Sequence, residues 1–192
     1  MTILKIAQLG HPILREQARE LTRDELLSAE TQDFIDDLIE TMRDADGAGL
    51  AAIQVYRPLR IFAIEVRPNN PRYPYRPPIP LTVLVNPRLE PIGTDMFDNY
   101  EGCLSVPNLR GVVARHVSLR VRGWDRLGAE VDEPAHGLRA CTYQHENDHL
   151  DGKVFVDRVR DATTLATWTE FDRHHRAAFA ERARALVERF GS

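Results

Sequence analysis

Cysteine, long apolar runs and an excess of basic charge are all scarce in this sequence. Its 192 residues include only two cysteines, Cys103 and Cys141, so a disulfide framework is not expected and a reducing cytoplasm is the default compartment. No apolar stretch approaches the roughly 20 residues of a membrane span, and the N-terminus lacks the pattern of a secretion signal. The net charge of −4 gives no basis for direct nucleic-acid readout. We therefore expect a cytoplasmic protein with no membrane segment.

The residues that are present are sufficient for one buried core. Hydrophobic residues make up 43% of the chain and charged residues 28%, which favours a single domain covering residues 1–192. Apolar residues recur at helical spacing within residues 28–45, with acidic residues largely on the other face. These apolar positions are Phe34, Ile35, Leu38, Ile39 and Met42. We therefore expect an N-terminal helix there, ending before the glycines of residues 46–49.

Three segments have the pattern of β-strands. Residues 61–66 and 81–85 are short apolar runs typical of buried strands. Val117, Leu119 and Val121 alternate with polar residues, which is the period of a half-buried strand, and residues 125–128 have the composition of a hairpin turn. Prolines crowd residues 67–80 and exclude regular structure. We expect a long surface loop there, which either borders a site or is a rigid connector.

The C-terminal part predicts a short exit and a last helix. Residues 153–156 are expected as a short strand or an extended segment, and the C-terminal helix occupies about residues 163–190. Thr167 and Glu170 have the spacing of a capping box near its start, and an apolar stripe follows at Phe179, Ala183, Leu186, Val187 and Phe190. Strands in a run, with helices gathered elsewhere, favour the α+β class. We expect short antiparallel strands packed around a central helix, with an N-terminal and a C-terminal helix.

The central helix is expected around the sequence QHENDHLDG at residues 144–152. It contains His145-Glu146-x-x-His149, and residues four apart lie on one face of a helix. Both imidazoles can then bind one metal ion, and Glu146 lies close enough to handle a proton on its water. Gly152 suits the end of the helix. The same pattern also occurs on surface helices with two solvated histidines, so a third ligand is needed to decide.

A catalytic metal usually takes three protein ligands and one water. A downstream glutamate, Glu170, would give a thermolysin-like site, but its spacing from Thr167 is better explained by capping. Upstream, Cys103 lies beside a glycine and shortly before a proline. Its thiolate would complete a Cys-His-His set, whereas a buried inert thiol is the alternative. Cys141, one helical turn before His145, is expected to pack beneath the site.

Three motifs together resemble those of the peptide deformylases. They are GAGLAAIQ at residues 47–54, EGCLS at residues 101–105 and QHENDH at residues 144–149, after a similar GHPILR segment at residues 10–15. The resemblance covers about residues 3–160 and is far more specific than any one motif. The departures are Tyr56, where the family often has glycine, the long proline-rich loop and the last helix. None of them involves a metal ligand, so they bear on substrate range and not on the chemistry.

The resemblance implies a metal-dependent hydrolase that removes the N-terminal formyl group from formyl-methionine of newly made polypeptides and releases formate. The implied metal ligands are Cys103, His145 and His149. Glu146 would accept a proton from water and pass it to the departing amine. The backbone N–H of Leu104 and the side chain of Gln54 would stabilise the oxyanion, and Gln54 also fits a structural role in bonding neighbouring backbone.

The implied cofactor is one divalent metal ion. The family implies Fe²⁺ in the cell, with Zn²⁺, Ni²⁺ or Co²⁺ as substitutes, and a Cys-His-His set accepts all four. Gly49 is expected to present its backbone to an extended peptide, and Glu101 either binds substrate or anchors its own loop. Leu138 and Cys141 either line the methionine pocket or pack in the core. Asp148 is expected to orient a ligand rather than to bind the metal.

Nascent formylated polypeptides are the expected partners, and the C-terminal segment adds a second possibility. Residues 172–190 contain five arginines and three carboxylates, and in some bacterial deformylases the last helix docks on the ribosome. A mildly basic helix is compatible with such docking, and a solvated amphipathic helix is the alternative. A monomer is the default oligomeric state.

Two other functions use parts of the same pattern. An HExxH peptidase would need a downstream third ligand and would have no use for Cys103. A deformylase-like fold with a purely structural metal would close the fourth coordination position and would not need Glu146 or Gln54. The remaining histidines have no metal spacing with this motif and are expected to be structural or on the surface: His11, His116, His136, His174 and His175.

Overall fold

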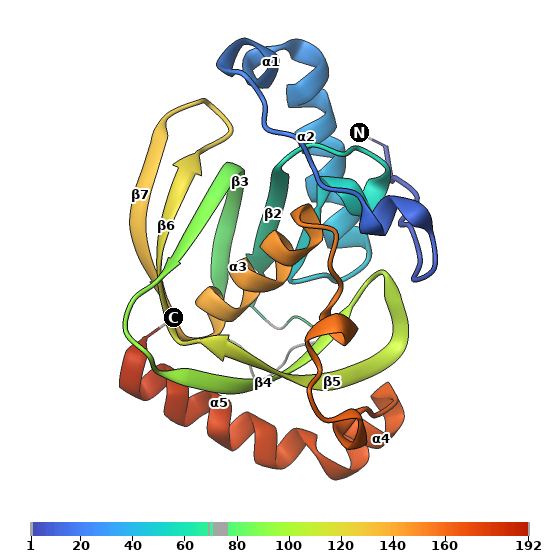
Figure 1. Ribbon diagram of the computed structural model, residues 1–192, viewed down its shortest axis with the longest axis vertical. Helices are drawn as coiled ribbons and strands as arrows, with labels where there is room; N and C mark the ends of the chain where they lie inside the picture. The colour runs from blue at the N-terminus through green and yellow to red at the C-terminus, as the bar shows by residue number, and fades with distance from the viewer. Residues whose placement is uncertain (1, 69, 71–76, 192) are drawn as a thin grey trace.

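A five-stranded antiparallel sheet and a separate two-stranded hairpin enclose one central helix (Figure 1). The computed structural model describes residues 2–68, 70 and 77–191. The sheet has the order β1-β2-β3-β6-β7, with bounds Gly49–Ala51, Ile61–Val66, Ile79–Pro91, Ser118–Trp124 and Glu130–His136. The hairpin joins β4 (Met96–Cys103) to β5 (Val106–His116). The central helix α3 (Gly137–Leu150) contacts every strand of the sheet and also β5.

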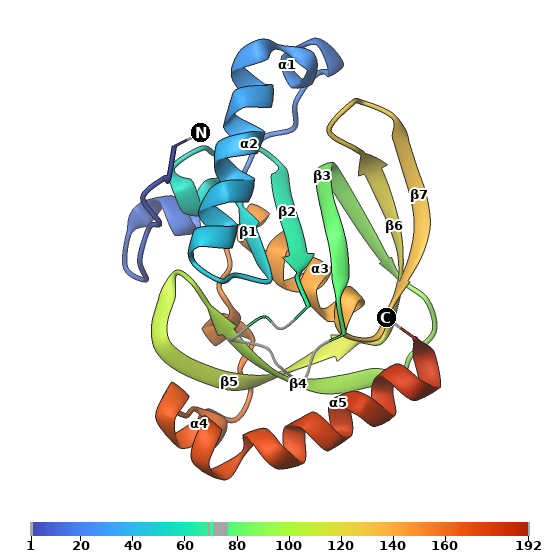
Figure 2. The same ribbon diagram turned by 180° about the vertical axis from the view of Figure 1, so that it is seen from behind.

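The other helices cover the outer surfaces of this arrangement. Figure 2 shows α2 across the face of β1 and β2 that is turned away from α3, while α4 and α5 run along the hairpin (Figure 1). The bounds are Arg23–Leu27 for α1, Ala29–Asp44 for α2, Trp168–His174 for α4 and Arg176–Phe190 for α5. Four 3-10 helices lie at Pro12–Arg15 (η1), Ala52–Val55 (η2), Phe155–Arg158 (η3) and Ala162–Thr164 (η4).

Strand β2 separates the two largest apolar clusters. Successive side chains of a strand point to opposite faces, so Phe62 and Ile64 pack on the α3 side while Ile61 and Ala63 pack on the α2 side. A strand covered on both faces has a continuous apolar sequence instead of an alternating one. This is why the run at residues 61–66 predicted the strand with its observed bounds.

The predicted N-terminal helix is α2, and its boundaries follow from local chemistry. The Ser28 side chain accepts a hydrogen bond from the backbone N–H of Thr31, which caps the first turn. The predicted apolar residues of the helix are all buried. The sequence analysis did not predict α1, although Thr22 and Glu25 form a reciprocal capping box at its start.

The remaining strand predictions were correct in position and too short in extent. β3 contains the predicted residues 81–85 but continues to Pro91, past a register shift between Val85 and Arg88. Strand β6 and the turn at residues 125–128 also occur, with the N–H of Gly128 donating to the carbonyl of Asp125. The proline-rich loop at residues 67–80 lies partly outside the described residues. No strand forms at residues 153–156, because the chain turns into the η3 helix at Phe155.

The predicted C-terminal helix is two helices. Thr167 caps α4 by accepting a hydrogen bond from the N–H of Glu170, as predicted, but the helix ends at His174, and α5 begins at Arg176. This break lets Phe171 of α4 and Phe179 of α5 pack together on Tyr100 of β4. The prediction of one helix over about residues 163–190 was therefore wrong, because residues 162–164 form η4 and the tertiary packing requires a bend.

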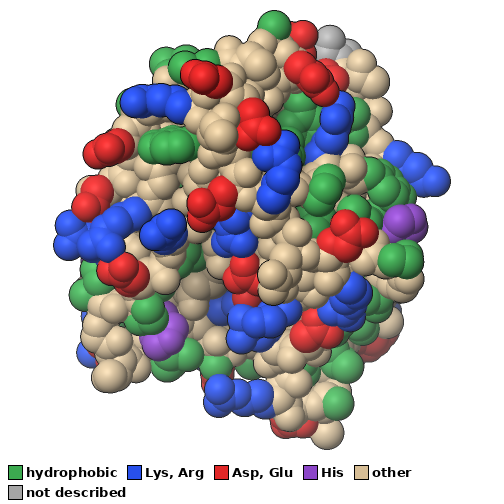
Figure 3. Space-filling model, turned by 45° about the horizontal axis from the view of Figure 1, so that its top comes forward, with side chains coloured by type: hydrophobic (Ala, Val, Ile, Leu, Met, Phe, Trp, Pro, Cys, Tyr) green, Lys and Arg blue, Asp and Glu red, His purple; other side chains and the backbone are tan. Residues whose placement is uncertain are grey.

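The observed architecture confirms the predicted α+β class, with antiparallel strands around α3 and helices near both ends of the chain. Helix α3 stops where predicted. Gly152 has a φ of +70°, and a Cβ atom there would lie 2.7 Å from the carbonyl oxygen of Arg15. Among the described residues, no helix combines the length and apolar character needed to cross a membrane. Acidic and basic side chains are interspersed on the face shown in Figure 3.

Candidate metal centre

The three predicted ligands meet at the junction of α3 and the end of β4. Helix α3 presents His145 and His149 one turn apart, with ring centroids separated by 5.0 Å. Cys103 is the last residue of β4, where the pairing with β5 shifts in register. Its Sγ lies 3.3 Å from Nε2 of His149, and the ligand atoms of all three residues lie within 4.8 Å of one another. Cys103 therefore forms one compact donor set with His145 and His149, which lie 42 and 46 positions after it in the sequence.

The electrostatics around Cys103 favour a thiolate. Burial by itself raises the pKa of the thiol, but the charge of His149 and the hydrogen bonds of both histidines outweigh it and hold the pKa well below its ordinary value. A buried anionic sulfur and two imidazoles form a donor set that suits Fe²⁺, Zn²⁺, Ni²⁺ or Co²⁺. The residues present therefore fit a divalent metal ion.

Glu146 lies beside this donor set in a position that only a glycine neighbour permits. The residue is 3% exposed, and its Oε2 has no hydrogen-bond partner within the described part of the chain. A Cβ atom added to Gly49 would lie 2.2 Å from Oε1 of Glu146, so β1 can approach α3 this closely only with glycine at that position. Burial raises the pKa of Glu146 to about 7. The carboxyl group can therefore exchange a proton near neutral pH.

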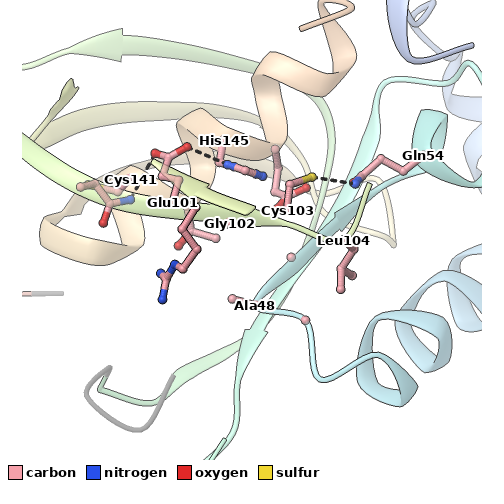
Figure 4. A pocket seen from close by; sticks show the side chains of 14 residues that line it. Ala48, Gln54, Glu101, Gly102, Cys103, Leu104, Cys141 and His145 are labelled. Carbon is pink, nitrogen blue, oxygen red and sulfur yellow. Dashed lines mark hydrogen bonds and ion pairs between the residues drawn. The ribbon is translucent and has the colours of Figure 1, made fainter. Parts of the chain in front are cut away.

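Gln54 faces the ligand Cys103 from η2. Its Oε1 accepts a hydrogen bond from the N–H of Ala51 at 2.8 Å, which turns Nε2 toward Oγ of Ser105 at 3.0 Å. Nε2 also lies 3.5 Å from Sγ of Cys103, the contact drawn in Figure 4. Leu104 follows Cys103 in the turn between β4 and β5. Gln54 and Leu104 both line the pocket beside the donor set.

Glu101 orients His145. Oε2 of Glu101 lies 2.8 Å from Nδ1 of His145, as Figure 4 shows, so Nε2 of that ring is turned toward Cys103. Burial raises the pKa of Glu101, but the charge and hydrogen bonds of Arg115 and the contact with His145 overcome this and leave the pKa well below its ordinary value. Of the two roles expected for Glu101, the observed contacts correspond to anchoring.

The sequence analysis missed Arg115. Two of its nitrogens donate to Glu101 at 2.7 and 2.9 Å, and its Nη1 donates to Oδ2 of Asp148 at 2.7 Å. Asp148 also accepts from Arg158 at 2.6 and 3.1 Å, so its carboxylate is engaged away from the donor set. The only sequence signal for Arg115 was a charged residue directly after the apolar run of residues 112–114.

Two predicted pocket residues lie in different places. The pocket next to the donor set is lined by Gly49, Glu101 and Cys141, among others. Leu138 instead packs against Ala183 and Leu186 of α5 in a separate cluster. Leu138, one turn before Cys141 on α3, is fully buried, and of the two settings expected for it the contacts with α5 correspond to packing in the core.

Tyr56 lies at the end of η2 in the left-handed conformation, with a φ of 65° and a ψ of 22°. A non-glycine residue is strained there, which explains why a glycine suits this position. The Tyr56 ring packs edge-on against His11 with centroids 5.0 Å apart and is 37% exposed. Tyr56 thus packs on the surface and is not among the residues that line the pocket.

A buried Cys-His-His donor set with an adjacent glutamate on an HExxH helix defines a metal-dependent hydrolase. The family model for polypeptide deformylase matches residues 3–164. The chain belongs to the polypeptide deformylase family, and it is accordingly an enzyme that removes the N-terminal formyl group of newly made polypeptides. The family uses a divalent metal ion, for which this chain has the Cys103, His145 and His149 set.

Named relatives cover most of the chain. The peptide deformylase 2 of Nostoc sp. is 40% identical over 169 residues, which are 88% of this chain and 93% of that protein. The peptide deformylase 1 of Bordetella pertussis is 42% identical over 160 residues, 82% of this chain and 88% of that protein. Helices α4 and α5 lie beyond the residues that the family model matches.

Solved structures of peptide deformylases have the same fold as this chain. The class I type b peptide deformylase of Acinetobacter baumannii bound to Met-Ala-Ser has a TM-score of 0.79 at 37% identity, covering 82% of this chain and 99% of that one. The peptide deformylase of Thermotoga maritima has a TM-score of 0.72 at 30% identity, covering 84% of this chain and 100% of that one. The arrangement of sheet, hairpin and α3 is therefore that of the family.

Proposed function

We propose that Cys103, His145 and His149 hold the divalent ion and that Glu146 is the acid–base residue for the hydrolysis of formyl-methionine at the start of nascent polypeptides. The observation that carries this proposal is the meeting of the three ligand atoms within 4.8 Å beside a buried carboxyl group. When bound, the ion supplies Lewis-acid polarisation and lowers the pKa of water in the site.

The role of Glu146 follows from its surroundings. Its Oε2 is buried and unpaired, and burial raises its pKa to about 7. A group with this pKa can accept a proton from the attacking water and return it to the leaving amine. Gly49 leaves room for Glu146 to reach the reacting atoms.

Gln54 and Leu104 are the proposed donors to the oxyanion that forms on the formyl carbon. The contact of Oε1 with Ala51 fixes the amide of Gln54, so its Nε2 points into the site. Preorganised donors of this kind stabilise developing charge without reorganising during the reaction. The backbone N–H of Leu104, in the turn after Cys103, is the second proposed donor.

The proposed peptide site runs along β1. This strand lies at the edge of the sheet and contains Gly49, so its backbone can pair with an extended peptide. Glu101 and Cys141 contribute to the pocket wall for the methionine side chain, whereas Leu138 is left out because it packs against α5. The Met-Ala-Ser complex of the Acinetobacter relative supports a peptide of this kind as the substrate class.

The test is formate release from formyl-Met-Ala-Ser by iron-loaded protein prepared without oxygen. The parent should release formate, and Glu146→Ala and Glu146→Gln should lose activity by roughly 10²–10⁴-fold while still binding one metal ion per chain. Full activity in these metal-loaded variants would rule out Glu146 as the acid–base residue. No formate from the loaded parent would rule out the deformylase function.

We further propose a single catalytic domain over residues 1–192 that works as a cytoplasmic monomer with Fe²⁺, and with Zn²⁺, Ni²⁺ or Co²⁺ as substitutes. The donor set accepts all four ions, and iron is the ion that the family resemblance implies. Metal analysis of protein purified without oxygen tests this assignment. Zinc in place of iron under those conditions would contradict it.

Docking on the ribosome through α5 is a second proposal, and it rests on charge. Three exposed arginines of α5, Arg182, Arg184 and Arg189, have no carboxylate partner among the described residues, and phosphates attract such side chains. Replacing all three with serine retains the buried stripe that holds α5 in place. The variant should lose co-sedimentation with ribosomes at low salt. Unchanged co-sedimentation would leave α5 as a solvated helix.

A further inference from the structure

The inner face of β4 carries a third polar residue in line with Cys103 and Glu101. Alternate residues of a strand share a face, so Asn99, Glu101 and Cys103 point the same way, toward α3. Asn99 lines the pocket together with Cys141 and is 1% exposed. The wall of the pocket beside Cys103 is therefore polar at Asn99 and Glu101.

The hydrogen bonds of Asn99 fix which way its amide faces. Its Nδ2 donates to Oε1 of Glu101 at 3.1 Å. Because a carboxylate only accepts, the amide nitrogen must face Glu101 and Oδ1 must be turned away from it. Oδ1 is buried and has no hydrogen-bond partner among the residues that the structure describes. Asn99 thus presents an unpaired acceptor in the pocket wall.

Methionine cannot pair with this acceptor. A thioether has no hydrogen to donate and is itself a weak acceptor. A buried carbonyl oxygen without a partner is unfavourable, so a ligand that brings a donor to Asn99 gains a hydrogen bond that methionine cannot make. A site with a buried polar group favours the substrate that can form this hydrogen bond over an analogue that cannot. A purely apolar pocket only weakly rejects a substrate with an added hydroxyl.

We propose that Asn99 sets the side-chain specificity of this enzyme, so that the pocket accepts formylated residues with an unbranched side chain ending in a hydrogen-bond donor as well as formyl-methionine. The donor pairs with Oδ1 of Asn99 while Nδ2 continues to hold Glu101. This inference rests on the proposed deformylase function and adds a substrate class to it.

The test compares two substrates of equal shape in the formyl-X-Ala-Ser series. In one, X is norleucine; in the other, the terminal methyl of norleucine is replaced by hydroxyl. The measured quantity is the ratio of kcat/KM for the hydroxyl substrate to kcat/KM for the methyl substrate. General damage to the enzyme affects both substrates and cancels in this ratio.

Two variants remove the acceptor. Asn99→Leu removes the whole amide. Asn99→Val also removes the acceptor, and its β-branched side chain suits a strand, so the variant is expected to fold. Asp98→Leu is the matched control, because Asp98 is the preceding residue of β4 and is exposed on the other face.

The ratio should fall roughly five- to tenfold in both Asn99 variants, as expected for one buried hydrogen bond, and should stay at the parent value in Asp98→Leu. An unchanged ratio in both Asn99 variants would overturn the inference and would mean that water occupies the acceptor permanently. In that case formate would still be released. If no substrate yields formate, the proposed function fails and the inference fails with it.

Discussion

Arg115 and Glu101 form a two-bond ion pair, at 2.7 and 2.9 Å, in which neither side chain is more than 4% exposed. The same guanidinium holds Asp148, so one cation neutralises two buried carboxylates on different elements. Glu101 in turn fixes the ring of His145. The geometry of the metal ligands therefore depends on a residue that touches neither the metal ligands nor the pocket.

Replacing Arg115 should damage both stability and metal binding. Arg115→Met leaves two buried carboxylates without their shared partner, which should lower the free energy of unfolding by about 3–5 kcal/mol. Urea unfolding of the metal-loaded proteins measures this. The matched control is Arg120→Met, because Arg120 pairs with Asp132 at an exposed site and should lose less than about 1 kcal/mol. Equal losses in the two variants would contradict the role given to Arg115.

Gly49→Ala should reduce activity by roughly 10²-fold, because displacing a catalytic group by about 1 Å has an effect of this size. The added Cβ would lie 2.2 Å from Oε1 of Glu146, so either the carboxylate or β1 must move. Formate release measures the loss. Gly93→Asn is a control at a glycine with open space around it and a φ of +75°, which asparagine tolerates. Normal activity in Gly49→Ala would mean that Glu146 functions in another rotamer.

Gln54→Ala should lower kcat by about 10²–10³-fold, the usual effect of removing one donor to an oxyanion. KM should change little, because the donor acts on charge that develops in the transition state. The control is Gln8→Ala, which removes an exposed amide that contacts the carbonyl of Leu104 from outside. A loss confined to KM would show that Gln54 binds the ground state instead.

The Leu138→Ala variant tests whether the side chain of Leu138 belongs to the core or to the substrate pocket. The side chain is fully buried against α5, so its truncation should lower the free energy of unfolding by about 2–5 kcal/mol. The kcat/KM for formyl-Met-Ala-Ser should remain at the parent value, because Leu138 does not reach the pocket. A selective loss of activity on formyl-methionine, with normal stability, would show that Leu138 is part of the pocket wall.

Patterns local in sequence predicted much of the fold and grouped three residues whose ligand atoms lie close together in the structure. The helical period of residues 28–45 reflects one buried face, and the apolar run of residues 61–66 reflects a strand covered on both faces. Each pattern is complete within a few consecutive residues, so they predicted α2 and β2 nearly to the residue. The HExxH spacing and the family motifs brought Cys103 together with His145 and His149, whose ligand atoms do meet. The role of these residues stays a proposal until activity is measured.

What the sequence did not predict depends on contacts between distant segments. The β4–β5 hairpin has a mixed pattern, because the inner face of β4 bears the polar Asn99 and Glu101 instead of apolar residues. Arg115 is buried only because two carboxylates from other segments compensate its charge. The orientation of Leu138 depends on where α5 packs, and the break at His175 depends on Phe171 and Phe179 sharing one aromatic cluster.

The packing of Tyr100 links the tail of the chain to the site. Tyr100 points to the opposite face of β4 from Glu101 and Cys103, and there it packs against Phe171 and Phe179 of α4 and α5. Strand β4, which carries Cys103, is thus packed on its other face by α4 and α5, which lie outside the region matched to the family. Exchanging tails between relatives would therefore alter the rigidity of the metal site without changing a residue in it.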